Sequence, residues 1–125
     1  MTVVYDTGVL IAADRNDRTV WADHRARLEQ GAVPVTTAPV VAQASRGPCQ
    51  AQLHRFLRGC DVQPLRADQG HPIGHLLGRV GLTDVVDAHV TLVAAEHHAV
   101  VLTGDPDDLR ALASHVRPAV IVHVI

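Results

Sequence analysis

Three aspartates stand where carboxylates from different elements of an α/β protein can meet. Asp6 follows the apolar run 2–5, Asp105 follows the run 100–104, and Asp87 lies in the first turn of the apolar segment 85–95. Ligands bind outside the carboxyl ends of the strands in an open α/β sheet, so such carboxylates can converge there. Like charges held close together raise one another's pKa. A bound divalent metal ion is the simplest explanation, and the chain is a candidate metal-dependent hydrolase.

The elements that would position these aspartates alternate along the chain. Strands are expected at 2–5, 32–36, 61–65, 100–103 and 119–125, and helices at 9–13, 20–28, 38–46, 53–60, 73–80, 84–95 and 107–115. The strands are apolar without a period of two, which indicates burial on both faces. The pattern predicts an α/β fold, a three-layer α/β/α sandwich with a central, mainly parallel sheet.

Helix boundaries follow from individual residues. Thr37 is expected to cap the helix whose first turn contains Pro39. Gly81 is expected to end the helix 73–80. Thr83 is expected to cap the helix that carries Asp84 and Asp87. Those two carboxylates are spaced i, i+3 and share one face of the first turns.

Length and composition limit the classes of protein to which the chain can belong. A chain of 125 residues with 47% apolar residues is expected to form one domain, residues 1–125, with no linker and no membrane span. Cys49 and Cys60 flank an expected helix, too far apart for a disulfide, so reduced thiols and a cytoplasmic location are expected. The net charge is −2, so any nucleic acid must be held by a local arginine patch.

Three segments resemble the PIN-domain family, and more narrowly the VapC-type toxins of bacterial toxin–antitoxin pairs. They are Val-Tyr-Asp-Thr-Gly-Val-Leu-Ile-Ala-Ala at 4–13, Asp-Val-Val-Asp-Ala-His-Val at 84–90 and Leu-Thr-Gly-Asp-Pro-Asp-Asp-Leu at 102–109. The resemblance implies an endoribonuclease dependent on Mg²⁺ or Mn²⁺, with Asp6, Asp87 and Asp105 binding the metal. Mg²⁺ prefers oxygen ligands and keeps several waters, which agrees with this residue set.

The chain departs from the family at one position. The family usually has a glutamate in the helix after the second strand, where this chain has Gln43. Glutamine keeps a carbonyl oxygen that can bind a metal or its water, but it removes one negative charge, so weaker metal binding is expected. Asp84 has two explanations, a further metal ligand or an acid favoured at the helix N-terminus. Arg46 and Thr103 are the residues expected to bind the RNA substrate.

Other functions fit less well. The chain has no lysine, which a receiver domain or a haloacid-dehalogenase-like phosphatase would need, and no P-loop. Nine histidines include no zinc motif. The remaining alternative is a catalytically weakened PIN-fold module that binds RNA or a protein partner without cleavage. The resemblance further implies a homodimer and a cognate antitoxin, for which Val20 and Trp21 are the expected exposed apolar contacts.

Overall fold

Five parallel strands form the centre of the protein. The structure is a computed structural model that describes residues 1–125. The strands are β1 (Val3–Tyr5), β2 (Val35–Thr37), β3 (Asp61–Gln63), β4 (Val100–Thr103) and β5 (Val122–Val124). They are ordered β3-β2-β1-β4-β5, so β1 lies in the middle and every neighbouring pair is parallel. The expected three-layer α/β/α architecture is confirmed.

The two edge strands differ from the expectation of full burial. β1 and β2 are entirely buried, whereas β3 is mostly exposed and β5 is exposed at His123 and Val124. Both edges are also shorter than the expected segments 61–65 and 119–125. An edge strand has a neighbour on one side only, and the polar residues Asp61 and Gln63 in β3 and His123 in β5 agree with this exposure.

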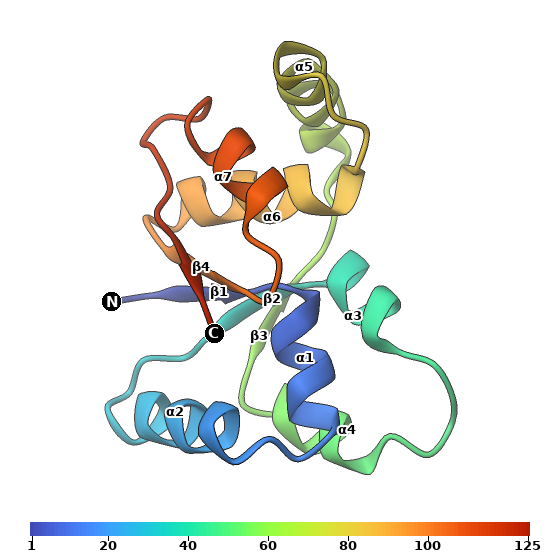
Figure 1. Ribbon diagram of the computed structural model, residues 1–125, viewed down its shortest axis with the longest axis vertical. Helices are drawn as coiled ribbons and strands as arrows, with labels where there is room; N and C mark the ends of the chain where they lie inside the picture. Colours follow the sequence, from blue (N-terminus) through green and yellow to red (C-terminus); the bar gives the residue numbers. More distant parts are fainter.

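Seven α-helices cover the sheet. They are α1 (Thr7–Asp14), α2 (Arg18–Glu29), α3 (Ala38–Ala44), α4 (Ala51–Leu57), α5 (Gly70–Val80), α6 (Val85–Glu96) and α7 (Asp107–Ala113), with a short 3₁₀ turn η1 (Ala67–Gln69). Figure 1 shows α5, α6 and α7 on one side of the sheet and α1, α2 and α4 on the other. The main core cluster contains Leu10, Leu53 and the aromatic Phe56 and extends from α1 to α6 and α7, and a smaller aliphatic cluster around Leu112 lies among α5, α6 and α7.

Two expected helix boundaries are confirmed and one is wrong. The Thr37 hydroxyl accepts a hydrogen bond from the Val40 N–H at 3.2 Å, which caps α3, and Gly81 ends α5 with a left-handed φ of 83°. Helix α6, however, is capped by Asp84 and not by Thr83. The Asp84 Oδ1 accepts the Asp87 N–H at 3.1 Å, because aspartate at this position reaches the third helical N–H as well as threonine does.

An aromatic cluster joins α2 and α4 to the centre of the sheet. His24 stacks on Phe56 with ring centroids 3.9 Å apart, and its Nδ1 lies 2.9 Å from the hydroxyl of the buried Tyr5. Trp21 packs edge-on against Phe56, and its indole N–H donates to the Ala13 carbonyl at 2.9 Å.

This cluster corrects the expected contact surface. Val20 is buried and Trp21 is half-buried in the core, so neither side chain is an exposed apolar residue for a partner or a second copy. The spacing of Val20 and Trp21 on α2 therefore reflects packing of this helix against the core. Both cysteines are free, as expected. None of the helices is both long enough and apolar enough to cross a membrane.

Thr37→Ala tests the cap that sets the start of α3. We expect a loss of about 1 kcal/mol in the free energy of unfolding, because the Val40 N–H loses its acceptor in a buried setting. Urea denaturation measures it. Thr37→Ser keeps the hydroxyl and is the matched control; equal destabilisation by both variants would show that packing of the threonine methyl, and not capping, is what matters.

Candidate functional site

The sheet places Asp6 beside the end of β4. The chain runs to one side of β1 for β2 and β3 and to the other side for β4 and β5, so β1 and β4 flank the point where the strand order reverses. Tyr5 pairs with Leu102, and the Asp6 N–H donates to the Leu102 carbonyl at 3.0 Å. This is the place where open α/β sheets bind ligands.

Thr103 fixes the Asp6 carboxylate. Its hydroxyl donates to Asp6 Oδ2 at 2.8 Å and also accepts the Asp105 N–H at 3.0 Å. One side chain therefore links the first aspartate to the loop that carries the third. Thr103 is fully buried, which corrects the expectation that it binds substrate. Its role is to orient the Asp6 carboxylate.

Gly8 lets the start of α1 approach the backbone at Gly104 closely. A Cβ added at Gly8 would lie 3.1 Å from the Gly104 backbone nitrogen, closer than ordinary packing allows. Both glycines line the same cavity as the aspartates. The sequence offered no clear signal for this pair, since each glycine is also explained by a turn.

Helix α6 brings two further carboxylates. Its first turn faces the ends of β1 and β4, and Asp84 and Asp87 both line the cavity, together with Asp6 and Asp105. Asp84 is exposed and uses Oδ1 for the helix cap. Its other oxygen has no protein partner, so Asp84 serves as a cap and still contributes charge to the cavity.

Gln43 reaches the same cavity from α3. The Thr7 hydroxyl donates to Gln43 Oε1 at 2.6 Å. This distance is typical of O–H···O bonds and short for N–H···O, which supports the orientation with the carboxamide NH₂ free. Thr7 thus orients Gln43 and does not cap α1, whose N-cap residue is Asp6. Thirty-six positions separate the two residues, so local sequence patterns could not show the contact.

The electrostatics of the cavity reflect crowded negative charge. Burial, and then Asp84 and Asp6, raise the pKa of Asp87 to about 7. Burial raises the pKa of Asp6 as well, although the hydrogen bonds from Thr7 and Thr103 oppose it. Both shifts mean that, without a cation, these carboxyls keep their protons to a higher pH than free aspartates do.

The donor set fits a hard divalent cation. The cavity has a volume of about 380 Å³ and is lined by no apolar side chain. Asp6 Oδ1 is buried and has no hydrogen-bond partner, an arrangement that is costly unless a ligand occupies it. No three carboxylate, imidazole or thiol side chains stand close enough together to coordinate one ion as they lie. Mg²⁺ keeps several of its waters, so a cavity with few direct ligands suits it.

Arginines are absent from this cavity. Arg46 is exposed and directs its guanidinium to the carbonyls of Ala42 and Ser45, so the structure does not bring it to the aspartates as expected. Asp108 does not line the cavity either, although its charge adds to the raised pKa of Asp87.

Comparisons with known proteins place the fold. No protein-family model matches the chain, and no curated protein matches it. Solved structures do match. VapBC2 from Rickettsia felis, bound to a DNA fragment from its promoter, has a TM-score of 0.74 at 15% identity, covering 100% of this chain and 99% of that one.

Two more solved structures agree. FitAB bound to an IR36 DNA fragment has a TM-score of 0.66 at 16% identity, over 98% of this chain and 94% of the other. PAE2754 from Pyrobaculum aerophilum has a TM-score of 0.63 at 18% identity, over 98% and 89%. The α/β fold therefore matches that of these three solved structures along essentially the whole chain.

Asp87→Asn should change how stability depends on pH. The folded protein keeps a proton on Asp87 between about pH 4 and pH 7, where the unfolded chain has lost it, so stability falls as pH rises through that window. The asparagine variant cannot ionise. We expect it to be more stable than the parent at pH 7 by about 1 to 2 kcal/mol, after allowance for partial exposure.

Metal-free urea denaturation at pH 4 and pH 7 measures this difference. Asp23→Asn, an exposed acid on α2 outside the cavity, is the matched control. Equal stability of the Asp87→Asn variant and the parent at both pH values would contradict the crowded-carboxylate account.

Proposed function

We propose that the protein is a ribonuclease dependent on Mg²⁺ or Mn²⁺ that acts as the toxin of a toxin–antitoxin pair. The observation that carries the proposal is the gathering of four aspartates at the ends of β1 and β4 and the start of α6, around a buried Asp6 oxygen that has no partner. The fold shared with VapBC2 and FitAB supports it. The acidic motifs resemble those of VapC-type toxins.

The residues would divide the work as follows. Asp6, Asp87 and Asp105 would hold the ion, and Asp84 would add charge while fixing the first turn of α6. A divalent ion supplies an activated water and neutralises charge on the scissile phosphate. Thr103 holds Asp6 Oδ2 in place, while Oδ1 is buried and has no protein partner.

Gln43 has a different part in this scheme from the glutamate of the family. Its Oε1 already accepts the Thr7 hydroxyl, and its NH₂ is a donor among carboxylates. A donor there can bind a phosphate oxygen, which a glutamate carboxylate would repel. Gln43 therefore suits substrate positioning, and the loss of one negative charge weakens the hold on the cation.

A protein partner belongs to the same proposal. VapBC2 and FitAB were both solved on DNA, and VapBC2 carries the name of the toxin class that the acidic motifs resemble. By this analogy an antitoxin would inhibit the protein. A homodimer in the cytoplasm remains the expectation for the free toxin.

A second function rests on the same glutamine. With Gln43 in place of a carboxylate, a PIN-fold module could bind RNA or a protein partner and not cleave. The four retained aspartates favour cleavage, because a binding module would have no use for crowded charge that destabilises the metal-free fold.

Cleavage of a labelled RNA pool with and without Mn²⁺ tests the proposal. We expect metal-dependent cleavage that falls at least 100-fold in Asp6→Asn and in Asp87→Asn, because each removes a carboxylate from the cavity. Asp23→Asn should cleave like the parent. Binding of RNA without cleavage by the parent protein would favour the module, and cleavage that is insensitive to Asp6→Asn would contradict this site.

Gln43→Glu tests the departure from the family pattern. We expect Mn²⁺ to bind about tenfold more tightly by calorimetry, because a further negative charge faces the ion, and the metal-free protein to melt at a lower temperature. Gln43→Met removes both polar functions at similar volume and is the control. Unchanged Mn²⁺ affinity in the Gln43→Glu variant would place Gln43 outside the metal site.

A further inference from the structure

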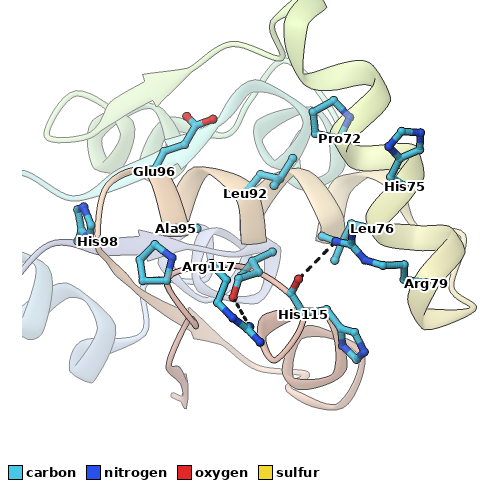
Figure 2. A pocket seen from close by; sticks show the side chains of 12 residues that line it. Pro72, His75, Leu76, Arg79, Leu92, Ala95, Glu96, His98, His115 and Arg117 are labelled. Carbon is cyan, nitrogen blue, oxygen red and sulfur yellow. Dashed lines mark hydrogen bonds between the residues drawn. The ribbon is translucent and has the colours of Figure 1, made fainter.

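The largest cavity of the protein lies away from the aspartates. It is an open groove of about 830 Å³ between α5, the end of α6 and the segment that joins α7 to β5 (Figure 2). Helix α6 begins at the acidic cavity with Asp84 and Asp87 and ends at the groove with Glu96. Its 12 residues correspond to about 18 Å at 1.5 Å per residue.

The rim of this groove is basic. Arg79, Arg117, His75, His98 and His115 line it, and all five side chains are exposed. Neither arginine forms an ion pair, since the ion pairs of the chain are those of Arg66 with Asp68 and with Glu96. The one acidic residue of the rim, Glu96, pairs with Arg66, which it shares with Asp68, so it does not pair with either arginine of the groove.

Both arginines are held in position by backbone carbonyls. Arg79 Nη2 donates to the His115 carbonyl at 3.4 Å, and Arg117 Nη1 donates to the Ser114 and Val116 carbonyls at 3.2 and 2.8 Å. Figure 2 shows the two guanidinium groups approaching this short segment from opposite sides. The other N–H groups of each guanidinium have no protein partner, so two oriented cations remain available to an oxyanion.

We propose that this groove binds phosphate groups of the RNA substrate at a distance from the acidic cavity, an inference that rests on the proposed function. A cavity lined by four aspartates and no arginine cannot hold the flanking phosphates of a polyanion. The groove supplies the missing positive charge. The flat imidazole rings of its histidines offer surfaces for bases.

The geometry sets the length of RNA that uses both sites. At about 3.4 Å per nucleotide for a stacked strand, the length of α6 corresponds to roughly five nucleotides. A 12-nucleotide RNA spans both sites, whereas a dinucleotide occupies only one. The groove should therefore affect the binding of long substrates and leave the chemistry at the aspartates unchanged.

The test compares Arg79→Ala/Arg117→Ala with the parent and with Arg58→Ala, an exposed arginine at the end of α4. Anisotropy of a fluorescent 12-nucleotide RNA is measured in EDTA, so that binding is read without cleavage. We expect the double variant to bind at least fivefold more weakly. The slope of log K against log salt should fall by about 1.4, as two phosphate contacts on a single strand require.

Cleavage provides the second measurement. In Mn²⁺ the double variant should show a higher KM for the 12-nucleotide RNA with unchanged kcat. Binding by the double variant equal to that of the parent would overturn the inference, and so would an equal loss in Arg58→Ala. If the parent protein binds polyglutamate more tightly than RNA, the inference is overturned and an acidic polypeptide is the ligand of the groove. If the parent protein never cleaves RNA but only the double variant loses RNA binding, the groove is supported as an RNA-binding site and the proposed nuclease activity is refuted.

Discussion

The pairing of β1 with β4 is the constraint on which the rest of the site depends. These strands come from opposite ends of the chain, yet their register sets the Asp6 N–H against the Leu102 carbonyl and the Thr103 hydroxyl against the Asp6 carboxylate. A slip of one residue would turn every side chain of the strand to the other face. The buried hydroxyl-to-carboxylate bond makes such a slip costly, so the same contact fixes the fold and aims the carboxylate.

The acidic cavity at the ends of these strands holds carboxylates whose ionised forms are destabilised by burial and by one another. Asp6 and Asp87 both have raised pKa values, and burial is the main cause for each. Two of the four carboxylates are held by hydrogen bonds, Asp6 by the Thr103 hydroxyl and Asp84 by the Asp87 N–H, and Thr103 also holds the backbone N–H of Asp105. The charges therefore cannot move apart freely, which is the condition under which a cation stabilises a site most strongly.

The sequence predicted the layers and the gathering of the aspartates because both follow from patterns of short range. Apolar runs indicate buried strands, and an aspartate after such a run indicates the carboxyl end of a sheet. What it missed depends on tertiary contacts. The role of Thr7 needs Gln43, which lies 36 residues away, and the inward packing of Trp21 needs Phe56. Arg46 was expected at the site from its closeness to Gln43, but the exposed backbone carbonyls after α3 hold its guanidinium elsewhere.

Exposed edges were missed for a related reason. The polar residues Asp61, Gln63 and His123 interrupt the apolar pattern of these strands, but the strand order is what shows that β3 and β5 have one neighbour each. The parallel arrangement could be inferred from the alternation of strands and helices. To predict the order of the strands, one must also know which helix covers which face of the sheet.

The aromatic cluster beneath the sheet has a spectroscopic consequence. Trp21 is the sole tryptophan of the chain, and it packs against Phe56 and under the guanidinium of Arg55, 5.3 Å from its ring. Its emission therefore reports on the layer formed by α1, α2 and α4. The opposite layer, α5 to α7, contains no fluorophore. Fluorescence and circular dichroism will give the same midpoint only when both layers melt together, so the protein carries an intrinsic probe of the cooperativity between its two halves.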